Sequence, residues 1–172
     1  MSNISILDES IKIKIFDKIN MLKIFLNNNI IDCKNVTAKE CYNYMNKIKS
    51  IIENYNTDIS FISCLMAKEY LIDKYEIENF DIGSKSQTAP GLDIDLMTKD
   101  GIHIIAEIKA TMSIRNSNLG SQQRDKICED LRKLNEQNAD KKYFFVTEQN
   151  TYNIIIKKLK RELNDIEIVL LN

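Results

Sequence analysis

The fold is decided by residues 92–110, which have the sequence LDIDLMTKDGIHIIAEIKA. Apolar side chains occupy the even positions at the start of this stretch and again after the glycine, so each half is expected to be a strand with one apolar face. Both apolar rows can be buried together only if even residues pair with even residues. A two-residue loop would break that match. A three-residue loop ending at Gly101, a residue that tolerates the left-handed conformation, keeps it, so Thr98 is expected to pair with Ile102.

The same register gathers charged side chains on the other face of the predicted hairpin. Asp93 would lie directly opposite Glu107, with Lys109 one step further along that face, whereas Asp95 would lie opposite Ile105. Opposed carboxylates at this spacing can share a hard divalent cation, and a lysine can orient a nucleophilic water or stabilise its hydroxide form. The alternative interpretation is a solvated hairpin face with cross-strand charge pairs.

Helical spacing of apolar residues predicts a mainly helical chain before the hairpin. We expect three helices, with a capping box between Thr37 and Glu40 opening the second. Their expected spans are 4–28, 37–55 and 58–74. A short strand over 77–82 and a polar loop over 83–91, which holds the only proline, are expected to follow.

After the hairpin, the patterns alternate between helix and strand. We expect a helix over 121–137, a strand over 142–147, a helix over 150–163 and a strand over 166–171. The order α-β-β-β-α-β-α-β behind a helical N-terminus predicts an α/β fold (α+β, with a mixed sheet). Residues 1–57 are expected to form a helical region that packs on a core made by residues 58–172.

The composition narrows the kind of site that the chain can build. Apolar residues make up 44% of its 172 residues, as in globular proteins. No run reaches 18 consecutive apolar residues, so we expect no membrane span, and the first residues lack a basic and an apolar region, so we expect no secretion signal. Four cysteines without a CxxC pair and a single histidine argue against a zinc site, and we expect reduced thiols in a cytoplasmic protein. A catalytic metal would need oxygen ligands, which favours Mg²⁺ or Mn²⁺. The net charge of −1 argues against a histone-like DNA binder.

Asp93, followed by Glu107-Ile108-Lys109 after a short hairpin, resembles the PD-(D/E)xK nuclease motif. Over residues 58–148 the predicted element order resembles the restriction-endonuclease fold, with its αβββαβ core. The resemblance implies that Asp93 and Glu107 bind Mg²⁺, which Mn²⁺ can replace, that the backbone carbonyl of Ile108 is a further ligand, and that Lys109 is catalytic.

Two further acidic residues enter through the same resemblance. Many members add an acid from the helix before the first strand, for which Glu69 is the candidate. Pro90 stands three residues before Asp93 instead of adjacent to it, and this departure leaves Asp95 as an alternative metal ligand.

The chain looks most similar to a small type II restriction endonuclease that cuts double-stranded DNA at a specific site. A Holliday-junction resolvase, another defence or repair nuclease, a non-cleaving nucleic-acid-binding module on the same fold and a helical interaction protein are the alternatives. Cutting both strands of a symmetric site favours a homodimer, and the apolar N-terminal helices could supply its interface.

Polar residues around the hairpin are candidates for contacts with the DNA backbone. The connection after Lys109 ends at a helix N-terminus, where side-chain donors and the helix dipole can hold a phosphate. An ordinary polar connection is the alternative. The candidates are Lys85, Ser113, Arg115, Asn116, Gln122, Gln123 and Arg124.

Overall fold

Five α-helices and four strands make up the computed structural model within the residues it describes, which are 5–32, 34–78, 80–83, 91–110 and 119–171. The elements in chain order are α1 (Ile6–Asn28), α2 (Ala38–Ile52), α3 (Tyr55–Lys74), β1 (Ile94–Met97), β2 (His103–Lys109), α4 (Ser121–Glu136), β3 (Lys141–Val146), α5 (Gln149–Lys158), a 3₁₀ turn (Lys160–Glu162) and β4 (Ile166–Leu170).

The strands form one mixed sheet in the order β1-β2-β3-β4. β1 is antiparallel to β2, and α4 and α5 connect β2, β3 and β4 as parallel neighbours. The predicted hairpin register is confirmed, because Ile94 pairs with Ala106. Its turn is also as expected: the Thr98 N–H donates to the carbonyl of Ile102 over 3.0 Å, and Gly101 has a φ of +79°. The chain is therefore a mixed α/β protein.

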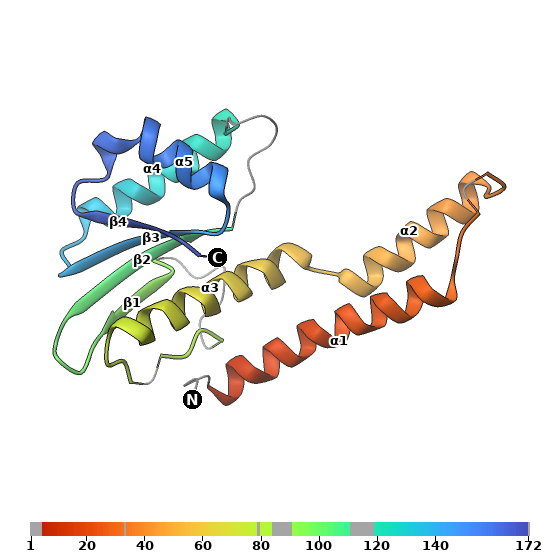
Figure 1. Cartoon of the computed structure of the whole chain (residues 1–172), viewed down its shortest axis with the longest axis horizontal. Helices are drawn as coiled ribbons and strands as arrows, with labels where there is room; N and C mark the ends of the chain where they lie inside the picture. Colours follow the sequence, from red (N-terminus) through yellow and green to blue (C-terminus); the bar gives the residue numbers. More distant parts are fainter. Residues whose placement is uncertain (1–4, 33, 79, 84–90, 111–118, 172) are drawn as a thin grey trace.

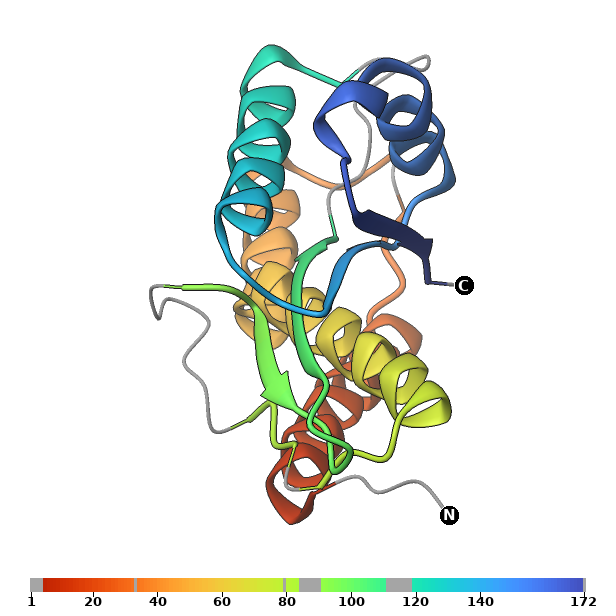
Figure 2. The same cartoon turned by 90° about the vertical axis from the view of Figure 1, so that its left-hand side faces the viewer.

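Helices cover both faces of this sheet. α3 lies on one face, and α4 and α5 lie on the other, as Figures 1 and 2 show. On the α3 side, Leu71 packs with Ile104 and Ala106, whereas Ile105 packs with Leu131 of α4. Alternate residues of β2 thus enter two different cores, as expected for a strand that pairs in parallel and is buried on both faces.

The expected strand over 77–82 does not form in residues 77, 78 or 80–82. This segment meets the hairpin at its turn, where the Lys99 N–H donates to the carbonyl of Glu76 over 3.0 Å and the Lys99 ammonium pairs with Glu78 at 3.0 Å. The side chain of Asp81 accepts hydrogen bonds from Ser5 and from the Gly83 N–H instead of facing a neighbouring strand. Two strands, not three, therefore separate α3 from α4 in the described part of the chain.

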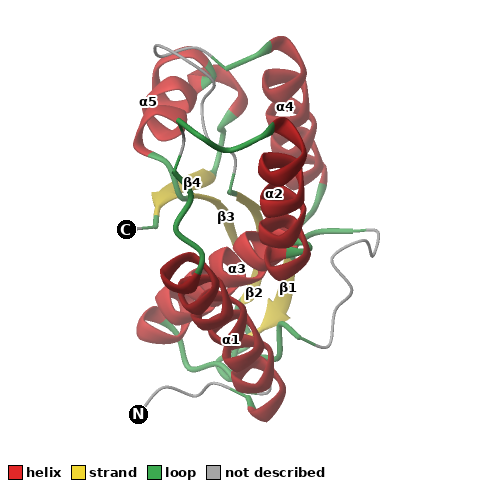
Figure 3. Ribbon diagram, turned by 90° about the vertical axis from the view of Figure 1, so that its right-hand side faces the viewer, coloured by secondary structure: helices red, strands yellow, loops and turns green. Residues whose placement is uncertain are grey.

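α1 and α2 form a helical arm that extends away from the sheet (Figures 1 and 3). The ring of Phe25 in α1 lies 4.9 Å from that of Tyr44 in α2, and Lys18 ties α1 to Asp58 of α3 at 3.0 Å. The capping box between Thr37 and Glu40 is confirmed at the start of α2. Neither the arm nor any other described helix combines the length and hydropathy of a membrane-spanning segment.

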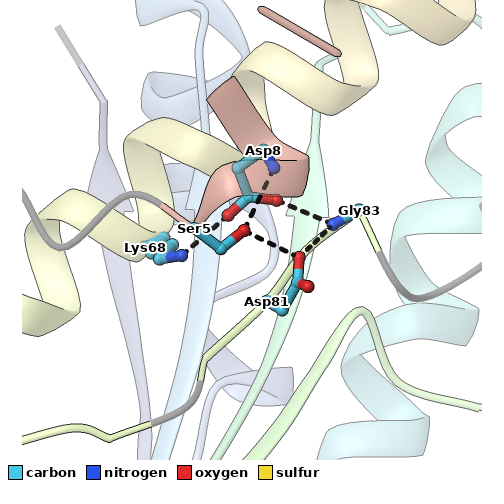
Figure 4. A network of polar contacts seen from close by, with 5 residues as sticks. All are labelled: Ser5, Asp8, Lys68, Asp81 and Gly83. Atoms are coloured by element: carbon cyan, nitrogen blue, oxygen red, sulfur yellow. Dashed lines mark hydrogen bonds and ion pairs between the residues drawn. The ribbon is translucent and has the colours of Figure 1, made fainter. Parts of the chain in front are cut away.

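A buried ion pair attaches the arm to the core (Figure 4). Lys68 of α3 lies 2.7 Å from Asp8 of α1, and both side chains are almost completely buried. The other carboxylate oxygen of Asp8 accepts the N–H of Gly83 over 2.8 Å. Burial raises the pKa of Asp8, but the hydrogen bonds from Lys68 and Gly83 and the charge of Lys68 outweigh it, so the pKa lies below its ordinary value.

Replacing Lys68 with alanine is expected to lower the free energy of unfolding by about 3–5 kcal/mol, because it leaves the Asp8 carboxylate buried without its cation. Since the pKa of Asp8 is lowered in the folded state, the stabilisation by the pair is present at neutral pH and is lost as the pH falls below about 4. Urea denaturation at pH 7 and pH 3 measures both effects. Arg132→Ala, which removes an exposed pair with Glu136, is the control and should change little. Equal losses in the two variants would contradict the role given to Lys68.

Candidate active site

Asp93 lies immediately before β1, and its side chain continues the hydrogen bonding between the two strands of the hairpin. Its carboxylate accepts a hydrogen bond from the main-chain N–H of Ile108 over 2.7 Å. The strand register, continued by one residue, places Asp93 opposite Glu107, as the sequence predicts. Within a strand, the N–H and C=O of one residue point to the same side, so the carbonyl of Ile108 also points toward Asp93.

Glu107 is the buried acid of this site. It is 6% exposed, and its Oε1 atom has no hydrogen-bond partner among the described residues. Burial first, and then the negative charges of Asp93 and Asp130, raise the pKa of Glu107 to about 8, and a hydrogen bond with Asp93 acts in the same direction. The nearby ammonium of Lys133 opposes the shift. The solvated-face interpretation of the hairpin is therefore wrong for Glu107, which lies in a site poor in counter-charge.

Lys109 is held by an acid from a different element. Its ammonium forms an ion pair with the carboxylate of Asp130, which lies on α4 and is nearly buried. The second oxygen of Asp130 pairs with Lys133, one turn further along α4, at 3.1 Å. Asp93, Glu107, Lys109, Asp130 and Lys133 together are called the acid–lysine cluster below.

The sequence analysis missed Asp130 and Lys133, although α4 carries a signal for the first. Ile127, Leu131 and Leu134 recur at helical spacing and are completely buried, and Asp130 falls within the same stripe. An aspartate on the buried side of an amphipathic helix requires a partner. The sequence does not say which partner, because Lys109 lies 21 residues away along the chain.

The structure does not bring every predicted acid to the cluster. Asp95 is exposed and forms a hydrogen bond with His103 over 2.8 Å, about 7 Å along the strand from Asp93. Glu69 is exposed on α3, which packs against the opposite face of the sheet from Glu107. Among the described residues, no hydrogen bond or ion pair joins Glu69 to the cluster, so its part in the site stays a prediction.

Most of the predicted DNA contacts cannot be placed. Lys85, Ser113, Arg115 and Asn116 lie outside the described residues. The other candidates lie in the first turn of α4, where Gln122 and Arg124 are exposed and Gln123 is half-buried. The side chain of Gln123 accepts the N–H of Gly120 over 3.2 Å, so part of its hydrogen-bonding capacity caps the helix.

Comparison of the chain with family models, with curated proteins and with solved structures gives no match. The described residues also contain no group of three or more histidine, cysteine, aspartate or glutamate side chains arranged around one metal position. Two lysines neutralise Asp130, so the cluster offers two carboxylates, those of Asp93 and Glu107, to a cation.

Glu107→Gln is expected to stabilise the metal-free protein near pH 8 by about 2–4 kcal/mol. The folded state holds the Glu107 proton up to about pH 8, whereas the unfolded chain releases it near the ordinary glutamate pKa of 4.5, so this group lowers stability as the pH rises between those values. Glutamine has the shape of the protonated acid and does not titrate. Urea denaturation in EDTA from pH 4 to pH 9 should show the two proteins diverging with increasing pH.

Glu129→Gln, at an exposed position of α4, is the matched control and should follow the wild type at every pH. A difference between wild type and Glu107→Gln that stays constant with pH would contradict the shifted pKa of Glu107.

Proposed function

We propose that this chain is a Mg²⁺-dependent endonuclease of the PD-(D/E)xK kind that hydrolyses phosphodiester bonds in DNA. The observation that carries the proposal is the buried carboxylate of Glu107, which faces Asp93 and has an oxygen without a hydrogen-bond partner among the described residues. Burial of one carboxylate beside another is unfavourable unless a cation or proton compensates the charge. The core does not require this unfavourable burial of a carboxylate, because apolar side chains such as Ile105 and Leu131 already fill it.

The residues present fit a hard divalent cation. Asp93 and Glu107 would hold Mg²⁺, with the carbonyl of Ile108 as a main-chain ligand and Mn²⁺ as a substitute. When bound, the cation would lower the pKa of a water ligand and neutralise charge on the phosphate. It would also complete the coordination of the Glu107 oxygen that has no partner and lower the pKa of that acid.

The side chains of the cluster would divide the remaining work. The N–H of Ile108 fixes the Asp93 carboxylate against the second strand. Lys109 is held beside Asp130 and can donate hydrogen bonds to the attacking water and to a phosphate oxygen. Asp130 is a positioning residue, because it holds the Lys109 ammonium without facing the substrate itself. Lys133 pairs with the second oxygen of Asp130 and so helps to fix the position of that carboxylate.

The choice of DNA as substrate, and of a type II restriction activity on a specific double-stranded site, rests on the motif resemblance. The exposed Gln122 and Arg124 at the start of α4 are suited to phosphate contacts. We propose a homodimer, because two-fold symmetry places two such clusters on the two strands of a symmetric site. A non-cleaving module is disfavoured, since it has no use for a buried acid placed beside a second carboxylate.

Plasmid DNA incubated with the protein and Mg²⁺ should be cut into discrete fragments, and EDTA should abolish the cutting. Asp93→Asn, Glu107→Gln and Lys109→Ala should each lower the cleavage rate by about 100-fold or more, because each removes a cation ligand or the charged donor. Asp95→Asn is the matched control on the same strand and should cleave like the wild type. Calorimetric titration with Mn²⁺ measures metal binding independently of DNA cleavage, and Asp93→Asn should abolish that binding.

The nuclease proposal would be contradicted if the protein cleaved neither duplex, single-stranded nor branched DNA with either metal. Loss of activity in Asp95→Asn with full activity in Asp93→Asn would assign the ligand role to the other aspartate.

Asp130→Asn is expected to lower kcat about 10-fold or more with little change in KM, because it frees the Lys109 ammonium while leaving the DNA-binding surface intact. The double variant with Lys109→Ala should be no slower than Lys109→Ala alone, since both changes disable one unit. Lys133→Ala, which leaves the Lys109–Asp130 pair in place, should have a smaller effect. Additive losses in the double variant would contradict a role for Asp130 through Lys109.

A further inference from the structure

α1 carries apolar side chains on two opposite sides. Its inner side faces α2 and α3, and Ile15 there is buried. The opposite side is exposed in the folded chain: Ile13 and Phe16 are 52% and 53% exposed, and Ile24 is 60% exposed. Helical geometry, at 3.6 residues per turn, places these residues with Asn20 in one stripe, on the other side of the helix from Ile15. Below, the outer stripe of α1 means Ile6, Glu9, Ile13, Phe16, Asn20, Lys23 and Ile24.

No described element covers the outer stripe, whose apolar residues Ile13, Phe16 and Ile24 are all more than half exposed. Single exposed isoleucines are common on protein surfaces, but several large apolar side chains exposed along one side of a helix mark an interaction surface. The hydrophobic effect therefore favours a partner with a complementary apolar helix face. Such a face must also suit the polar residues at the two ends of the stripe.

The charges of the stripe are self-complementary about Phe16. Glu9 lies seven residues before Phe16 and Lys23 lies seven residues after it, so each charge is about 10 Å from the phenyl ring along the axis. A two-fold axis beside Phe16 would place the two phenyl rings together and bring Glu9 of each chain opposite Lys23 of the other. A parallel alignment would instead place like charges against each other, which is unfavourable.

We propose that the outer stripe of α1 pairs with the same stripe of a second copy of this chain, with the two helices antiparallel and related by two-fold symmetry. Such an isologous contact closes on itself and yields a dimer, not a filament. It gives the homodimer proposed above a defined interface on the arm, on the side of α1 opposite to Tyr44 of α2. The interface depends on α1 alone, so association and cleavage can fail independently.

Sedimentation equilibrium of the full chain should show a dimer at micromolar concentration. Phe16→Glu should raise the dissociation constant about 30-fold or more, because it places two carboxylates at the centre of the contact. Met45→Glu, at a position of α2 that is 57% exposed, is the matched control and should remain dimeric. Circular dichroism establishes that both variants keep their helices.

A charge exchange tests the antiparallel arrangement. Glu9→Lys alone should weaken the dimer, since it would face Lys23 of the second copy, and adding Lys23→Glu should restore it. A monomeric wild type, a dimer that withstands Phe16→Glu, or a double variant without recovery would each overturn the proposal. A monomer that cleaves DNA would overturn the interface alone, whereas a dimer that cannot cleave would overturn the nuclease alone.

Discussion

The pairing of Ile94 with Ala106 in the hairpin is the constraint on which the rest of the structure depends. Because side chains alternate along a strand, this one register sends Ile104 and Ala106 toward α3 and sends Ile105 and Glu107 toward α4. If the hairpin pairing shifted by one residue along β2, an entire row of apolar side chains would leave the core and Glu107 would turn toward α3. The hydrophobic effect on one face therefore fixes the position of the acids on the other.

Burial of Glu107 follows from the parallel pairing of β2 with β3. A parallel neighbour requires a crossover helix, and α4 supplies it, covering the face that carries Glu107 and Lys109. The same helix brings Asp130 to Lys109. The low accessibility of the site and the anchoring of its lysine are thus two consequences of a single connection, the helix between β2 and β3.

Local patterns were sufficient to predict the helices, the four strands that form and the hairpin register. They are features of consecutive residues, such as the alternation over 92–110 and the capping box at Thr37. The strand expected over 77–82 failed because strand formation also needs a partner, and Asp81 instead bonds to Ser5 and Gly83. The pairing of Asp130 with Lys109 was beyond prediction for the same reason: it depends on where α4 crosses the sheet, which no short spacing encodes. The Asp93–Glu107 pairing was accessible because a hairpin of known register is itself local.

The charge of the acid–lysine cluster connects its structure to the chemistry proposed for it. When Glu107 is ionised, the three carboxylates and two ammonium groups of the cluster leave one net negative charge. A proton on Glu107 removes that charge. A divalent cation in place of the proton would make the cluster positive by one unit, which suits a phosphodiester anion. Without the two lysines, the same cation would face three carboxylates and leave the site negative toward DNA. The ion pairs of Asp130 thus do more than anchor Lys109: they set the charge that the site would present to its substrate once a cation is bound.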